Sequence, residues 1–161
     1  MNTLYLFTDG SVATKSKIGF GAFLLISELA ISHDLAKQNI HLKRFEGTSS
    51  SKLELQILIN ALNTISVNNS NLVVFTDSQN IIGLPGRREK LERNNYLSKK
   101  GKLLANHELY KSFFTLIDQM DLTFEKVKGH QRSRQKNEID GLFTLVDRAS
   151  RNALRNELLN D

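Results

Sequence analysis

Two short segments decide the predicted fold: LYLFTDGS at residues 4–11 and LVVFTDSQ at residues 72–79. Each contains an apolar run of the kind that forms a buried strand, and each run is followed by Thr-Asp. If the two strands are adjacent and parallel, they hold Asp9 and Asp77 side by side at the carboxyl edge of a sheet, where open α/β sheets bind ligands. Such a cluster of carboxylates repels itself unless a cation fills it.

Two further carboxylates accompany apolar helical patterns. Glu54 heads the apolar stripe of a predicted helix over residues 51–66, and a carboxylate on that face must find a partner. If this helix packs on the sheet, Glu54 points at the strand ends that carry Asp9 and Asp77. Asp147 lies within FTLVDRASRNAL at residues 143–154, in the last predicted helix.

Each of the first three acids also has a purely structural interpretation. Asp9-Gly10 fits the turn of a β-hairpin, and Asp77 fits the N-cap of the helix that follows it. Ser51 and Glu54 fit a capping box, in which the glutamate reaches back to the helix start. Each interpretation is sound alone, but together they require three coincidences.

The whole chain predicts an α/β fold with one mixed sheet. Apolar runs predict strands at about 3–9, 19–27, 40–46, 72–76 and 122–127, and helical spacing predicts helices over 51–66, 104–120 and 139–159. A further helix begins near Gln79 and stops before Pro85, while residues 28–39 show no clear period and are expected to form a loop or to extend the second strand. We therefore predict an antiparallel meander continued by parallel strands, five in all, flanked by helices. No linker divides the chain, so residues 1–161 are expected to form a single domain.

Composition narrows the setting. The 161 residues are 40% hydrophobic and 24% charged, and no apolar run approaches the ~20 residues that cross a bilayer. The absence of cysteine excludes disulfides and thiolate zinc sites. We expect a cytoplasmic protein that does not bind membranes. The net charge of +5 favours an anionic partner, nucleic acid above all.

The positive charge gathers in two stretches. Residues 85–105, which we call the basic arm, hold seven Lys and Arg against two Glu, and residues 126–136 hold five Lys and Arg with no acid. Solvated loops explain either stretch taken alone. Two stretches beside a carboxylate cluster favour a track for phosphates, and the arm residues predicted to contact them are Arg87, Arg88, Lys99, Lys100 and Lys102.

These motifs together resemble type I ribonuclease H. The chain matches that family in Thr-Asp-Gly-Ser at 8–11, Thr-Asp-Ser-Gln at 76–79 and the helix-start Glu54. It also matches an Asn-x-x-Leu-aromatic helix start at 106–110, Val-Lys-Gly-His at 127–130, and a terminal helix with Asp-Arg-Ala-Ser-Arg-Asn-Ala at 147–153. Each motif is short, but their order and spacing are specific, and the resemblance spans nearly the whole chain.

The resemblance implies an endonuclease that hydrolyses the RNA strand of an RNA/DNA hybrid with two Mg²⁺ ions, or Mn²⁺. It assigns Asp9 as the bridging ligand, Glu54 and Asp77 to one ion, and Asp147 to the other. Oxygen ligands suit such hard cations, and two ions ~3.5 to 4 Å apart activate water and stabilise the leaving oxygen. His130 matches the family histidine that shuttles protons or helps the product leave.

The resemblance also implies a hybrid-binding surface. It places Ser11, Ser50, Ser51 and Gln79 against the substrate. Ser50 and Ser51 stand where many family members carry two asparagines, so contacts to the minor groove and to 2′-hydroxyls are expected to differ. The arm lacks tryptophan, so binding there would depend more on charge. The expected partner is an RNA/DNA hybrid, bound by a monomer that needs no obligate protein partner.

Two aspartates compete for the fourth metal position. Asp140 stands ten residues after His130, as is common in the family, and Asp147 stands seventeen after it. Small residues follow Asp147 and would let the helix approach the sheet, whereas bulky residues follow Asp140. We therefore predict Asp147, with residues 131–138 forming an extended basic loop around His130.

Two other classes of function remain open. A non-catalytic module that binds hybrids or double-stranded RNA would keep the basic stretches but would not need the four acids. Another nuclease of the same superfamily would share the acids and act on DNA, since fold does not fix function.

Overall fold

The computed structural model describes residues 2–65, 70–127 and 137–160. Its elements, in chain order, are β1 (Asn2–Ala13), β2 (Ile18–Ile26), α1 (His33–Gln38), β3 (His41–Phe45), α2 (Ser50–Thr64), β4 (Ser70–Thr76), α3 (Gln79–Arg93), α4 (His107–Gln119), β5 (Leu122–Lys126) and α5 (Glu138–Leu159).

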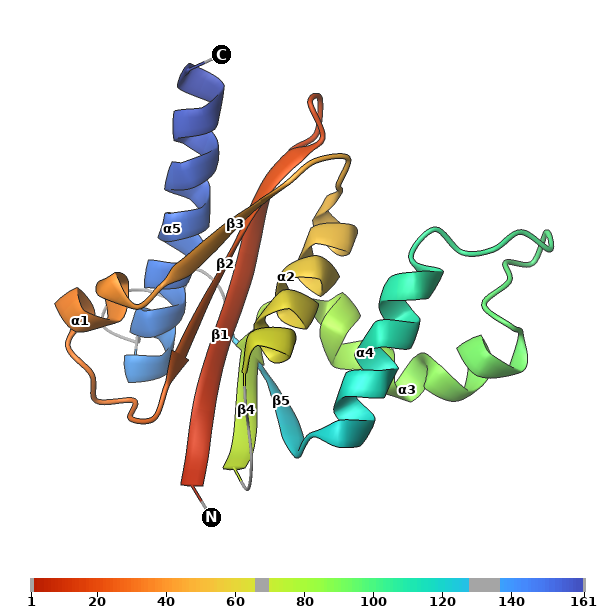
Figure 1. Cartoon of the computed structure of the whole chain (residues 1–161), viewed down its shortest axis with the longest axis horizontal. Helices are drawn as coiled ribbons and strands as arrows, with labels where there is room; N and C mark the ends of the chain where they lie inside the picture. Colours follow the sequence, from red (N-terminus) through yellow and green to blue (C-terminus); the bar gives the residue numbers. More distant parts are fainter. Residues whose placement is uncertain (1, 66–69, 128–136, 161) are drawn as a thin grey trace.

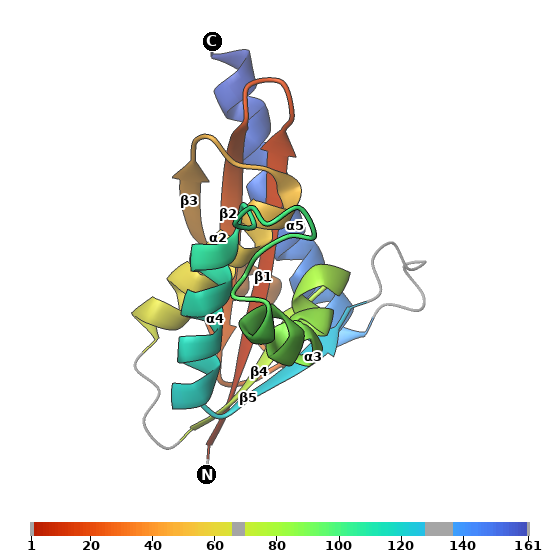
Figure 2. The same cartoon turned by 90° about the vertical axis from the view of Figure 1, so that its right-hand side faces the viewer.

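The five strands form one mixed sheet in the order β3-β2-β1-β4-β5. β1, β2 and β3 pair antiparallel, and β1, β4 and β5 pair parallel. Figure 1 shows α5 and α1 on one face of this sheet and α2, α3 and α4 on the other; Figure 2 shows α3 and α4 from their own side. The predicted fold class is therefore confirmed.

The alternation of side chains along the strands produces two cores. Leu6 and Val74 face α2 and α4, whereas Phe7 and Phe75 face α5, with their rings stacked at 4.8 Å between centroids. Helix α2 lies very close to the sheet: a Cβ added to Gly21 would stand only 2.6 Å from the Cβ of Ile57, so the absence of a side chain at Gly21 allows this approach. A Cβ added to Gly10 would likewise stand 2.8 Å from Leu53 Cδ2, so the first turn of α2 lies against β1 directly beside Asp9.

Besides the helix that contains Pro85, three predicted elements differ from the structure. Residues 28–39 contain the short helix α1, whose single turn and a half is too brief to show a period, although Ser32 caps it by accepting from Leu35 N. The third predicted helix begins at His107 rather than at residue 104, and β1 continues beyond Asp9 to Ala13.

The prediction that a helix stops before Pro85 is wrong. Helix α3 contains Pro85 and continues to Arg93. Proline removes one backbone hydrogen bond, but its ring lies on the exposed side of this helix. Leu84 is fully buried and Leu91, two turns further on, packs against the same core, so burial on both sides of the proline holds the helix together.

No helix within the described ranges is both long and apolar enough to span a membrane.

Candidate active site

Asp9 and Asp77 lie at matching positions on neighbouring strands. The parallel pairing of β1 with β4 runs as far as Phe7 and Phe75, and each aspartate stands two residues further on. Because side chains alternate along β1, Asp9 points to the same α5 side of the sheet as Phe7, and Asp77 follows directly after the end of β4. Burial, the hydrogen bond to Asp147 and the charge of Asp77 raise the pKa of Asp9 to about 8.

The structural interpretations of these two residues are both wrong. Asp9 does not form a turn, because it lies inside β1 opposite Ala22, and the turn to β2 comes at residues 14–17. Asp77 does not cap α3; the N-cap is Ser78, whose Oγ accepts from Ile81 N at 3.2 Å. Neither a turn nor a helix cap therefore explains why these two aspartates meet at the sheet edge.

Glu54 reaches the same edge from α2. The capping box is wrong as well, because Ser49 is the N-cap of α2 and accepts from Lys52 N. Glu54 Oε2 instead accepts a hydrogen bond from Ser78 Oγ at 2.5 Å. Burial raises the pKa of Glu54, the bond from Ser78 lowers it, and the charge of Asp77 raises it, so that the net shift is upward.

Of the two competing aspartates, the structure brings Asp147 to Asp9. The side chain of Asp147 lies within hydrogen-bonding reach of Asp9, and this contact is one of the causes that raise the pKa of Asp9. Asp140 lies two turns away, about 10 Å along the helix axis, where its backbone N–H donates to Asn137 Oδ1. Ser150, one turn after Asp147, is 0% exposed and lies against β1, so the small residues that follow Asp147 face the sheet at close range.

We call Asp9, Glu54, Asp77 and Asp147 the acidic edge. Three interactions link its members: Asp9 with Asp147, Asp9 with Asp77, and Glu54 with Asp77. Among the described residues no three Asp, Glu or His side chains already form a metal site. The donor set nevertheless fits a hard divalent cation, because every donor is a carboxylate oxygen and a cation would offset both the burial and the mutual repulsion that raise the pKa values of Asp9 and Glu54.

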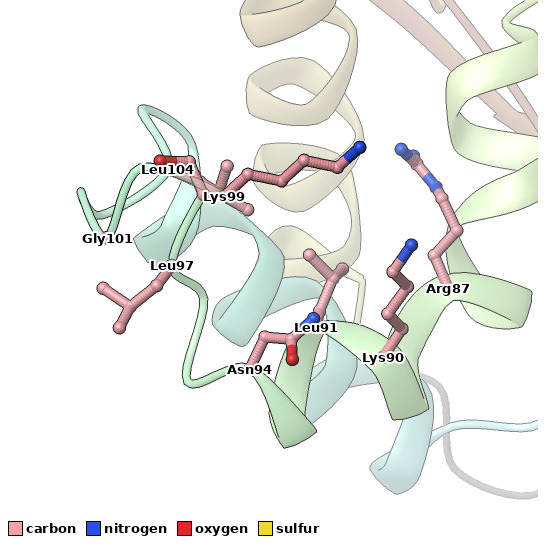
Figure 3. Close-up of a pocket in the computed structure, with 9 residues that line it drawn as sticks. Arg87, Lys90, Leu91, Asn94, Leu97, Lys99, Gly101 and Leu104 are labelled. Atoms are coloured by element: carbon pink, nitrogen blue, oxygen red, sulfur yellow. The ribbon is translucent and has the colours of Figure 1, made fainter.

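The basic arm is only partly a loop. Arg87 and Lys90 lie on α3, and Lys99 lies on the loop that follows; together with Leu91 and Leu97 they line an open cavity of about 600 Å³. Figure 3 shows the charged ends of Arg87, Lys90 and Lys99 pointing toward one another. Lys100 and Lys102 are exposed on the same loop.

Arg88 has a different environment from its neighbour Arg87. Its guanidinium pairs with Asp118 and Glu92, at 2.6 and 2.7 Å, and lies 5.0 Å from the centroid of the Phe114 ring. These contacts join α3 to α4. Arg87 donates to Asn80 Oδ1 within its own helix.

The other predicted substrate residues lie around the acidic edge. Ser50 and Ser51 are exposed in the first turn of α2. Ser11 Oγ lies 3.2 Å from Ser150 Oγ, and Gln79 Oε1 accepts from Lys126 Nζ at 2.8 Å. His130 and most of the predicted loop at 131–138 lie outside the described residues; Asn137 caps α5 and Glu138 begins it.

Sequence reasoning missed three residues of this region. Ser78 stands within Thr-Asp-Ser-Gln, and a serine before an apolar helical pattern is a signal for an N-cap that could have found it. Lys90 belongs to the basic arm, but its place beside Arg87 is visible only once α3 passes Pro85. Lys126, at the end of β5, carries no local signal of its contact with Gln79.

Comparison with known proteins places these features in a family. A sequence model of the RNase H family matches residues 1–153. The chain is 28% identical over 149 residues to a ribonuclease H of Syntrophomonas wolfei, covering 88% of this chain and 94% of that protein. It is 30% identical over 144 residues to a ribonuclease H of Roseobacter denitrificans, covering 88% of this chain and 93% of that one.

Solved structures share the fold at lower identity. The solution structure of the PFV RNase H domain matches with a TM-score of 0.69 and 17% identity, over 94% of this chain and 92% of that one. The crystal structure of LC9-RNase H1, described as a type 1 RNase H with the type 2 active-site motif, matches with a TM-score of 0.68 and 15% identity, over 95% of this chain and 72% of that one.

Proposed function

The chain belongs to the RNase H family, and from this membership together with the acidic edge we propose that it hydrolyses the RNA strand of RNA/DNA hybrids. The observation that carries the proposal is the meeting of Asp9 and Asp77 on adjacent parallel strands, with Asp147 hydrogen-bonded to Asp9 and Glu54 within the field of Asp77. The relatives named above are ribonucleases H, which supports a hydrolytic nuclease.

We assign Asp9, Glu54, Asp77 and Asp147 as ligands of divalent cations, Mg²⁺ in the first place and Mn²⁺ as an alternative. Bound at this edge, two such ions would lower the pKa of the attacking water and stabilise the leaving 3′ oxygen. The residues themselves place four carboxyl groups at one edge of the sheet. The raised pKa of Asp9 supports this role, because burial and the neighbouring carboxyl groups disfavour its charge and a bound cation would offset both.

The substrate is placed by groups that flank the acidic edge. Gln79 follows Asp77 by two residues, and its Oε1 is occupied by Lys126, which leaves the amide N–H₂ to donate to acceptors in a minor groove. Ser11, Ser50 and Ser51 supply hydroxyls near the same edge. Arg87 and Lys99, with Lys100 and Lys102, supply charge for a phosphate backbone. His130 keeps its proposed role in proton transfer or product release.

The test compares cleavage of four labelled substrates of the same sequence: an RNA/DNA hybrid, single-stranded RNA, duplex RNA and duplex DNA. We expect cleavage of the hybrid alone, dependent on Mg²⁺ or Mn²⁺ and abolished by EDTA. Equal cleavage of duplex DNA would support a different nuclease of the superfamily. Hybrid binding without any cleavage would support a binding module, and activity that survives EDTA would contradict the assigned ligands.

A further inference from the structure

A single buried hydroxyl joins the start of α3 to the acidic edge. Ser78 is 5% exposed and takes part in two side-chain hydrogen bonds. Its Oγ accepts from Ile81 N, which caps α3, and its O–H donates to Glu54 Oε2. Because a hydroxyl has one proton and two lone pairs, both bonds form at once.

The backbone around Ser78 leaves its side chain little freedom. Its N–H donates to Thr76 Oγ1 at 3.1 Å, and its carbonyl accepts from Ile82 N at 3.1 Å. The side chains of Thr76 and Ser78 are both buried at the carboxyl end of β4. The hydroxyl is therefore held by the sheet on one side and by the helix on the other, and it presents a fixed donor to Glu54.

Glu54 needs such a donor more than its neighbours do. It reaches the edge from a helix on the opposite face of the sheet from α5, so strand register does not fix its carboxylate as it fixes Asp9 and Asp77. The charge of Asp77 repels it. A hydrogen bond to a carboxylate is among the stronger kinds, and a ligand carboxylate is commonly oriented by a second hydrogen-bonded group.

We propose that Ser78 is a positioning residue for Glu54: its hydroxyl holds the carboxylate of Glu54 at the acidic edge in the orientation that binds a divalent cation. The inference rests on the proposed function for the identity of the cation site. It gives Ser78 a role beyond capping α3, and it makes metal affinity depend on a residue that carries no charge.

The test measures Mg²⁺ binding to the full chain without substrate, by isothermal titration calorimetry, alongside the thermal unfolding midpoint. We expect Ser78→Ala to weaken Mg²⁺ binding by roughly 10-fold or more, the range found when such orienting partners are removed. Ser78→Thr keeps the hydroxyl, and we expect it to restore most of the affinity.

Two controls separate positioning from helix capping. Ser49→Ala removes the equivalent cap from α2, where Oγ accepts from Lys52 N, without touching the bond to Glu54. It is expected to lower the unfolding midpoint as Ser78→Ala does, while Mg²⁺ affinity stays at the wild-type value. In a Glu54→Gln background, Ser78→Ala is expected to add little further loss of affinity, because the carboxylate that it orients is gone.

The outcomes are distinct. Equal Mg²⁺ affinity in wild type and Ser78→Ala would overturn the inference, and so would a wild-type protein that binds no Mg²⁺. Equal losses in Ser78→Ala and Ser49→Ala would reduce Ser78 to a cap and overturn it too. A chain that shows the expected affinity pattern and yet cleaves no hybrid would overturn the proposed function alone.

Discussion

The acidic edge and the basic arm hold their charged side chains by different means. Asp9 and Asp77 are fixed by the register of two parallel strands, so short sequence motifs determine where they meet. The arm has the denser run of charge, but its cations are sorted by partners far away in sequence: Arg88 pairs with Asp118, whereas Arg87 faces an open cavity. Backbone periodicity therefore predicts the position of a charge well, and a run of like charges does not predict which members are available for a ligand.

The largest expected effect concerns the fourth carboxylate. Asp147→Asn removes the charge that lies against Asp9 with little change in volume, and we expect hybrid cleavage in Mg²⁺ to fall by several orders of magnitude while the protein stays folded. Asp140→Asn is the matched control two turns away and is expected to keep most activity. Initial rates and circular dichroism of both variants provide the measurement; the opposite result would favour the spacing from His130 over the packing of α5.

The second prediction tests whether the acidic edge is strained without metal. Because the pKa of Asp9 is raised from 3.8 to about 8, its contribution to stability is present below the lower value and is lost as the pH rises through the higher one. In EDTA we expect wild type to lose stability across that interval. Asp9→Asn has no charge to bury and should be more stable than wild type at pH above about 8, by an amount on the order of a few kcal/mol.

Chemical denaturation in EDTA at several pH values would check this second prediction. The advantage of Asp9→Asn is expected to shrink toward pH ~4, where Asp9 is protonated in wild type as well. Saturating Mg²⁺ should reverse the order of stability, because only wild type retains the full ligand set. A variant that is less stable than wild type at every pH would show instead that Asp9 supports the fold.

The same contrast separates the features that the sequence could predict from those that it could not. It predicted the five strands, the parallel meeting of Asp9 with Asp77, and the packing that sets Asp147 apart from Asp140, because each depends on local periodicity and side-chain size. The sequence did not predict that α3 continues past Pro85, because the helix is stabilised there by the burial of Leu84 and Leu91, which is a tertiary effect. The contacts of Arg88 with Asp118 and of Ser78 with Glu54 join residues 30 and 24 positions apart, and no local pattern reports them.

The third prediction compares residues of the basic arm that face the open cavity, Arg87 and Lys99, with Arg88, which is already paired with acids. Replacing Arg87 or Lys99 with Gln should weaken hybrid binding and flatten its salt dependence by about 0.7 to 0.9 for each phosphate that the variant no longer neutralises. Arg88→Met is expected to change the salt slope less than either, because Asp118 and Glu92 already neutralise that guanidinium. Binding titrations over a range of salt concentrations would measure the slopes. Equal flattening in all three variants would mean that the ion pairs open when substrate binds.

The smallest expected effect is that of the ion pair itself. The hydrogen bond from Arg88 lowers the pKa of Asp118, so the pair stabilises the fold above the ordinary value of 3.8, and this contribution is lost as the pH falls through the lowered value. Asp118 is exposed, and exposed pairs contribute little. We expect Asp118→Asn to lower the unfolding midpoint slightly near neutral pH, and less at high salt or once the pH has fallen below the lowered pKa of Asp118, where wild type also lacks the charge. The same variant also tests the basic arm. Without Asp118, the guanidinium of Arg88 loses a charge partner and becomes available to a phosphate, so the salt dependence of hybrid binding should become steeper. A salt slope that stays at the wild-type value would show that Arg88 joins α3 to α4 and does nothing for the substrate.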